Sequence, residues 1–203
     1  RGLLCDLGIV ARAVPSLLLG AAKPVSAEKV TILGVPIDNL TMDETLDRIE
    51  AYLDAPGAHH VAFVNAACLN DAYVDEAYRA VLGQVSLCLA DGIGLKLAGQ
   101  ILRRPVRQNV NGTDLFPRLC ARLAPRRERV FLLGARPGVA EMVRDWIYER
   151  HPGVVVCGLR DGYFGADEEE AVARSIAASG ATLLLVALGA PRQEFWIGRH
   201  LAE

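Results

Sequence analysis

Apolar residues along most of the chain form two kinds of segment that follow one another. Short runs of β-branched residues and leucine have strand composition, and the segments between them carry apolar residues at helical spacing. The predicted strands lie at 30–37, 59–65, 85–89, 130–134, 154–158 and 182–189. The predicted helices include 41–53, 71–82, 95–102 and 167–178. This order predicts an α/β fold, with a Rossmann-like parallel sheet flanked by helices.

The first 29 residues do not follow this order. They are apolar but are interrupted by Gly8, Pro15 and Gly20, and their longest uncharged run, 13–22, is too short to span a bilayer. We therefore expect an N-terminal apolar extension over 1–29 that docks on the domain or on a membrane surface. The alternative is a poorly ordered terminus. Residues 30–203 are expected to form a single compact domain.

Local signals support several of these elements. Thr41 with Glu44 three residues later is typical of a capping box at a helix start. Thr113 is expected to cap another helix. The near-continuous apolar run at 182–189 is typical of a central parallel strand.

Composition narrows the class of protein. The net charge is −2, which gives no basic field for nucleic acid. Five cysteines are scattered without a Cys-x-x-Cys pair, which favours a reducing cytosolic setting over a zinc site or a disulfide framework. His59 and His60 begin a predicted strand without a third ligand nearby, so we expect no metal site and no cofactor.

The clearest candidate for chemistry is Asp91. The apolar run at 85–89 ends in Ala90-Asp91-Gly92-Ile93-Gly94, which places a carboxylate at a strand end. Ligands of open parallel sheets bind outside the carboxyl ends of the strands. The alternative is that Asp91 caps the following helix.

Polar or glycine-rich ends follow five predicted strands and are expected to share one edge of the sheet. They are Asn65, Asp91, 134–136, 161–163 and 189–194. Three run into helices, whose N-terminal amides favour anions such as a diphosphate, and Arg136 and Arg192 add positive charge. The turn at 134–138 is neither Gly-x-Gly-x-x-Gly nor a P-loop. These ends indicate a nucleotide-like ligand, but neither NAD nor ATP in particular.

An ordered set of short motifs resembles the WecG/TagA/CpsF family of bacterial glycosyltransferases. The resemblance covers roughly residues 30–203. Its motifs are Gly34-Val35-Pro36-Ile37-Asp38, Asn65, Ala90-Asp91-Gly92-Ile93-Gly94, Gly112-Thr113-Asp114-Leu115, Phe131-Leu132-Leu133-Gly134, Asp161-Gly162-Tyr163-Phe164 and Gly189-Ala190-Pro191-Arg192-Gln193-Glu194.

The resemblance implies inverting transfer of an N-acetylmannosamine-type or related sugar from a UDP donor to a polyprenyl-diphosphate-linked acceptor. The products of the family enter cell-surface polysaccharides, and the implied location is cytoplasmic, peripheral on the inner face of the plasma membrane. A homo-oligomer is compatible with the sequence.

The resemblance also implies roles for particular residues. Asp91 corresponds to the proposed general base and Asn65 to a substrate contact, while Gly162, Tyr163 and Gln193 correspond to the nucleotide side. The further residues expected to bind substrate are Gly92, Asn109, Thr113 and Asp114, and those expected to bind the nucleotide are Gly134, Ala135, Arg136 and Gly189.

Three features depart from the family pattern. Phe63 stands where the family often has Thr, and Asn109 stands where it usually has Arg. The family also continues past the last helix into an arginine-rich tail, which we expect to be absent from this chain. Two other functions remain open: a non-catalytic sugar-nucleotide binding or assembly protein, and a nicotinamide-dependent oxidoreductase that would lack the glycine fingerprint.

Overall fold

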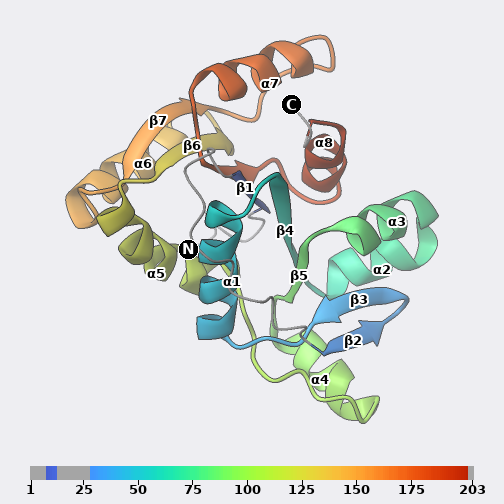
Figure 1. Ribbon diagram of the computed structural model, residues 1–203. Helices are drawn as coiled ribbons and strands as arrows, with labels where there is room; N and C mark the ends of the chain where they lie inside the picture. Colours follow the sequence, from blue (N-terminus) through green and yellow to red (C-terminus); the bar gives the residue numbers. More distant parts are fainter. Residues whose placement is uncertain (1–7, 13–27, 201–203) are drawn as a thin grey trace.

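A computed structural model describes residues 8–12 and 28–200 (Figure 1). The strands are β1 (Gly8–Arg12), β2 (Lys29–Ile32), β3 (Val35–Asp38), β4 (Ala58–Val64), β5 (Leu87–Ala90), β6 (Arg129–Gly134), β7 (Val155–Arg160) and β8 (Leu183–Ala187). The helices are α1 (Met42–Asp54), α2 (Ala66–Val74), α3 (Glu76–Gln84), α4 (Ile93–Ile101), α5 (Gly112–Arg126), α6 (Val139–Arg150), α7 (Glu169–Ala178) and α8 (Arg192–His200). The predicted α/β fold is confirmed.

The main sheet has six strands in the order β5-β4-β1-β8-β6-β7. Strand β4 pairs with β5 in parallel, and β6 pairs in parallel with both β7 and β8. Strand β1 is antiparallel to both of its neighbours, with Ile9 opposite Val61 on one side and Leu185 on the other. Five strands of the sheet are therefore parallel, as predicted, and β1 makes the sheet mixed at its centre.

The central strand comes from the segment that we expected to be an extension. Gly8 and Ile9 are buried, so this part of 1–29 belongs to the core. Residues 1–7 and 13–27 lie outside the described residues, and Lys29 begins β2. Because β1 opposes both β4 and β8, those two strands run in the same direction. The carboxyl ends of all five other strands of this sheet therefore lie on one edge. Two strand spacings, about 10 Å, separate β4 from β8.

Alternate residues of the strands point to opposite faces of the sheet and pack into two hydrophobic layers. Val61, Leu132 and Leu185 face a core that α1, α5 and α6 cover. Ala62 and Val64 of β4 face α2, α3 and the β2–β3 hairpin on the other side. Phe131 and Val186 face α7 and α8 there. The short strands are apolar on both faces because helices cover both faces.

Two predicted elements divide into shorter ones. The predicted strand 30–37 is an antiparallel hairpin, because Leu33 and Gly34 both adopt left-handed backbone (φ 48° and 83°) and reverse the chain. The predicted helix 71–82 is two helices that meet at Asp75, whose carboxylate accepts the amides of Ala77 and Tyr78. The capping box of Thr41 and Glu44 is confirmed.

Candidate functional site

Each of the five parallel strands ends at one of the predicted site segments. On one half of the edge, β4 leads to Asn65 and β5 leads to Asp91. On the other half, β6 leads to 134–136, β7 to 161–163 and β8 to 189–194. Strand β1 lies between the halves (Figure 1). The edge therefore offers two neighbouring groups of loops, which are described in turn.

Asp91 is half-buried at the end of β5. Its amide donates to the carbonyl of Val64 (2.8 Å), which ties the end of β5 to the end of β4 just before Asn65. The N-cap residue of α4 is Gly92, which follows Asp91 directly. Asn65 is itself an N-cap, since its Oδ1 accepts the amide of Cys68 at 3.0 Å.

Asn109 lies against the backbone next to Asp91. Its Oδ1 accepts the amide of Gly92 at 2.7 Å, and the next residue, Val110, donates its amide to the carbonyl of Ala90 at 2.9 Å. Gly92 has φ 93°, a conformation that residues with a side chain rarely adopt. A side chain from 17 residues further along thus fixes the turn that carries the carboxylate.

The loop that carries Asn109 is held to α1 by side-chain contacts. Gln108 Oε1 accepts the amide of Met42 at 2.9 Å, and Asn39 Oδ1 accepts the amide of Arg107 at 2.8 Å. Arg107 pairs with both carboxylate oxygens of Glu44 at 2.7 and 3.0 Å. The pKa of Glu44 is lowered, first by the backbone amide of Thr41 and then by Arg107. The guanidinium of Arg107 is thus paired with Glu44 and helps to hold this loop on α1.

Helix α5 begins beside the same strand end, because Val110 pairs with Ala90 immediately before it. Its cap is Asn111, which accepts the amide of Asp114 and donates to the carboxylate of Asp114, both at 2.8 Å. The prediction that Thr113 is the cap is therefore wrong. Thr113 and Asp114 lie exposed in the first turn of α5.

Phe63, which departs from the family pattern, points into the core. Its side chain is buried in the layer beneath α1 and α5, two residues before Asn65. Burial in this core layer explains why a large apolar side chain occupies position 63.

On the second half of the edge, hydrogen bonds join the ends of β6, β7 and β8. Ala135 donates its amide to the carbonyl of Ala187 (2.7 Å) and accepts the amide of Gly162 (2.9 Å). Gly134 must be glycine, because a Cβ there would lie 2.4 Å from the carbonyl oxygen of Ala187. These contacts bring together three of the predicted nucleotide-binding segments.

Arg192 reinforces the same group of loops. Its guanidinium donates to the carbonyls of Gly162 and Phe164, each at 3.0 Å, and lies 4.9 Å from the centre of the Phe164 ring. The sequence predicted that Arg192 adds positive charge for binding an anion. In the structure, its hydrogen bonds join the start of α8 to the loop that follows β7. Arg136 is exposed in the loop that precedes α6.

Gln193 and Tyr163 differ sharply in exposure. Gln193 is 1% exposed, and its Nε2 donates to Glu194 Oε1 at 2.9 Å. It follows Gly189, whose φ of 82° begins the turn into α8. Tyr163 is 70% exposed, and its amide is held by the Asp161 carboxylate at 2.8 Å. An exposed aromatic ring at the edge of the site is suited to stacking on a base.

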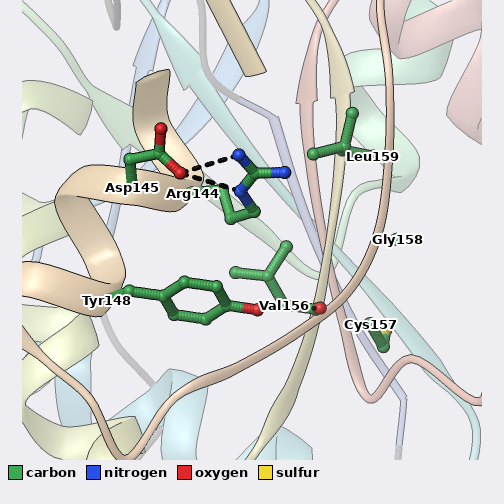
Figure 2. Close-up of a pocket in the computed structure, with 7 residues that line it drawn as sticks. All are labelled: Arg144, Asp145, Tyr148, Val156, Cys157, Gly158 and Leu159. Atoms are coloured by element: carbon green, nitrogen blue, oxygen red, sulfur yellow. Dashed lines mark hydrogen bonds and ion pairs between the residues drawn. The ribbon is translucent and has the colours of Figure 1, made fainter. Parts of the chain in front are cut away.

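An open groove of about 530 Å³ lies elsewhere, between α6 and the edge strand β7 (Figure 2). Arg144 and Asp145 form an ion pair with each other at its rim (2.7 Å), and Tyr148 reaches across to the carbonyl of Val156. None of the predicted site residues lines it. The strand ends, rather than this groove, therefore define the candidate site.

Within residues 8–12 and 28–200, no helix is long and apolar enough to cross a membrane, and no group of three or more His, Cys, Asp or Glu side chains is placed to hold a metal ion.

Comparison with known proteins supports a single family. The model of the glycosyl transferase WecG/TagA/CpsF family matches residues 30–203. A relative from Bacillus spizizenii is 32% identical over 149 residues, which is 73% of this chain and 57% of the relative. A relative from Staphylococcus aureus is 31% identical over 175 residues, covering 85% of this chain and 68% of the relative. Both are named N-acetylglucosaminyldiphosphoundecaprenol N-acetyl-beta-D-mannosaminyltransferase.

Proposed function

Because the chain belongs to the WecG/TagA/CpsF family of glycosyl transferases, we propose that it transfers an N-acetylmannosamine-type or related sugar from a UDP donor to a polyprenyl-diphosphate-linked acceptor. The observation that carries the proposal is the position of Asp91. Its carboxylate follows a parallel strand, on a turn fixed by Asn109, at the edge where the loops of β6, β7 and β8 also converge.

Asp91 is proposed as the general base. The acceptor hydroxyl oxygen forms a bond to the anomeric carbon, its proton passes to the Asp91 carboxylate, and the bond from the anomeric carbon to the diphosphate oxygen breaks to release UDP. Attack from the side opposite the diphosphate inverts the anomeric configuration. A positioned base of this kind typically contributes about 10²–10⁴-fold to the rate.

The loops of β6, β7 and β8 are proposed to bind the UDP part of the donor. Their backbone is ordered by hydrogen bonds of Ala135, Gly162 and Arg192. The N-terminal ends of α6 and α8 are proposed to favour the anionic diphosphate. Arg136 is proposed to add positive charge beside the diphosphate, and Gln193 to line the nucleotide side. Asn65, Thr113 and Asp114 are proposed to contact the sugar or the acceptor.

The lipid-linked acceptor gives the proposed place of action. A polyprenyl chain resides in the bilayer, so the reaction takes place at the cytoplasmic face of the membrane, with the protein bound peripherally.

A donor screen with the 203-residue chain tests this function. The acceptor is N-acetylglucosamine linked through a diphosphate to a short polyprenyl chain, and transfer is followed by mass spectrometry. We expect transfer from UDP-N-acetylmannosamine or a related UDP-sugar, with an inverted linkage. UDP binding without transfer from any donor would favour the sugar-nucleotide binding protein instead. Binding of NAD in place of UDP would contradict both.

A further inference from the structure

Helix α4 carries an exposed apolar stripe immediately after Asp91. Ile93, Leu97 and Ile101 follow one another at four-residue spacing and are 67%, 52% and 81% exposed. The opposite side of the helix is anchored, because Leu95 and Gly99 are buried and Gly99 packs on Val106. The helix therefore has a fixed orientation and turns an apolar face outward.

The charge around this stripe differs from that of the chain as a whole. Residues 92–113 contain Lys96, Arg103, Arg104 and Arg107 and no Asp or Glu, although the net charge of the chain is −2. Arg107 is paired with Glu44. The other three basic groups form no ion pair with any residue that the structure describes, and Arg103 and Arg104 are exposed just beyond the helix end.

We propose that α4 is the surface by which this protein docks on an anionic phospholipid bilayer. Ile93, Leu97 and Ile101 enter the interface between head groups and acyl chains, while Lys96, Arg103 and Arg104 contact the lipid phosphates. An apolar face flanked by basic residues is typical of helices that lie in the membrane interface. Basic groups near an anionic surface each strengthen binding about five-fold.

The position of α4 in the fold agrees with this role. The helix begins two residues after Asp91 and, with nine residues, is about 13 Å long. It lies at one end of the molecule in Figure 1, away from α6 and α7. Docking through α4 would hold the end of β5 close to the membrane surface, where the diphosphate of a lipid-linked acceptor resides. This inference rests on the proposed function, because that function supplies the lipid-linked acceptor. Its test measures vesicle binding and does not require turnover.

The test is sedimentation of the 203-residue chain with vesicles of phosphatidylcholine that contain about one third phosphatidylglycerol, compared with phosphatidylcholine alone. We expect binding to the anionic vesicles that weakens as salt is added. Leu97→Glu and, separately, Ile101→Glu should weaken it at least about ten-fold. Both side chains are more than half exposed, so the melting temperature should stay near that of the unmodified chain.

Matched controls separate this surface from general effects. Met142→Glu changes a side chain of similar exposure (57%) on α6 and should leave vesicle binding unchanged. Arg103→Gln with Arg104→Gln should weaken binding about twenty-five-fold. Arg118→Gln with Arg127→Gln removes the same charge from α5 and its end and should have little effect. Arg103 and Arg127 both have left-handed backbone, so the two pairs are alike in that respect as well.

Equal vesicle binding by all these variants would overturn the proposal. So would a change in self-association caused by Leu97→Glu without a change in vesicle binding, because α4 would then be a contact between copies. If the chain shows no transfer activity but vesicle binding responds as expected, the docking surface stands and the proposed function fails. If the α4 variants lose vesicle binding yet keep transfer to a water-soluble short-chain acceptor, both stand.

Discussion

Replacing Asn109 by Ala should uncouple the turn at Asp91 from the loop that holds it. The substitution removes the acceptor of the Gly92 amide, a contact of 2.7 Å. A neutral hydrogen bond contributes about 1 kcal/mol net, and an amide left without a partner costs about 1–3 kcal/mol if it is buried. Because Asn109 and Gly92 are half-buried, water can replace part of the contact, and the expected loss is about 1–2 kcal/mol.

This loss should appear as a decrease in melting temperature of about 2–6 °C, followed by circular dichroism. The effect on turnover should be larger than the effect on stability. A displacement of about 1 Å in a reacting group can cost about a hundred-fold in rate, so we expect turnover to fall about ten- to a hundred-fold. Turnover is measured as UDP release that depends on the lipid-linked acceptor.

Gln108→Ala is the matched control. Gln108 lies next to Asn109, is also half-buried and also accepts one backbone amide, that of Met42 at 2.9 Å. Its contact holds the start of α1 rather than the turn at Asp91. We expect a similar decrease in melting temperature with turnover nearly unchanged. If the two variants lose turnover equally, or if Asn109→Ala loses none, Asn109 does not position the base and the reasoning is refuted.

Three further predictions concern other parts of the molecule. Gly134→Ala places a Cβ 2.4 Å from the Ala187 carbonyl oxygen, so we expect weaker UDP binding by calorimetry and a lower melting temperature; unchanged values for both would show that the ends of β6 and β8 tolerate separation. Burial lowers the pKa of His60 to about 4 from its ordinary 6.5, so the unfolded chain binds more protons between these pH values. Stability should therefore be full above pH 6.5 and fall by about 3 kcal/mol as the pH decreases to 4, with a shallower decrease in His60→Leu; identical denaturant-unfolding curves for the two proteins across this window would contradict the assignment. Finally, turnover should survive EDTA, because helix N-termini and arginine are proposed to stabilise the diphosphate; loss with EDTA and recovery with manganese would refute this.

Local patterns predicted those parts of the fold whose determinants lie close together in the sequence. The capping box at Thr41 involves only residues within one helical turn. The continuous apolar run at 182–189 is explained by the burial of β8 on both faces of the sheet. Strand ends were also predicted well enough to place Asp91, Ala135 and Gly162 on one edge. Strands that alternate with helices run in the same direction, so their carboxyl ends lie on the same edge of the sheet.

What the patterns missed depends on contacts between distant segments. Strand β1 has only five residues, and its partners lie at 58–61 and 183–186, so nothing nearby in the sequence reveals its antiparallel pairing. Asn111 and Thr113 are both good caps two residues apart, and only the backbone geometry selects Asn111. The contact between Asn109 and Gly92 likewise joins two loops.

The most direct test of the central claim is the turnover of Asp91→Asn with UDP-N-acetylmannosamine and the short-chain lipid-linked acceptor. Asn keeps the size of the side chain but cannot take the proton of the acceptor hydroxyl. We predict unchanged UDP affinity by calorimetry, an unchanged melting temperature, and turnover reduced by about 10²–10⁴-fold. Near-full turnover in this variant would show that Asp91 is not the base.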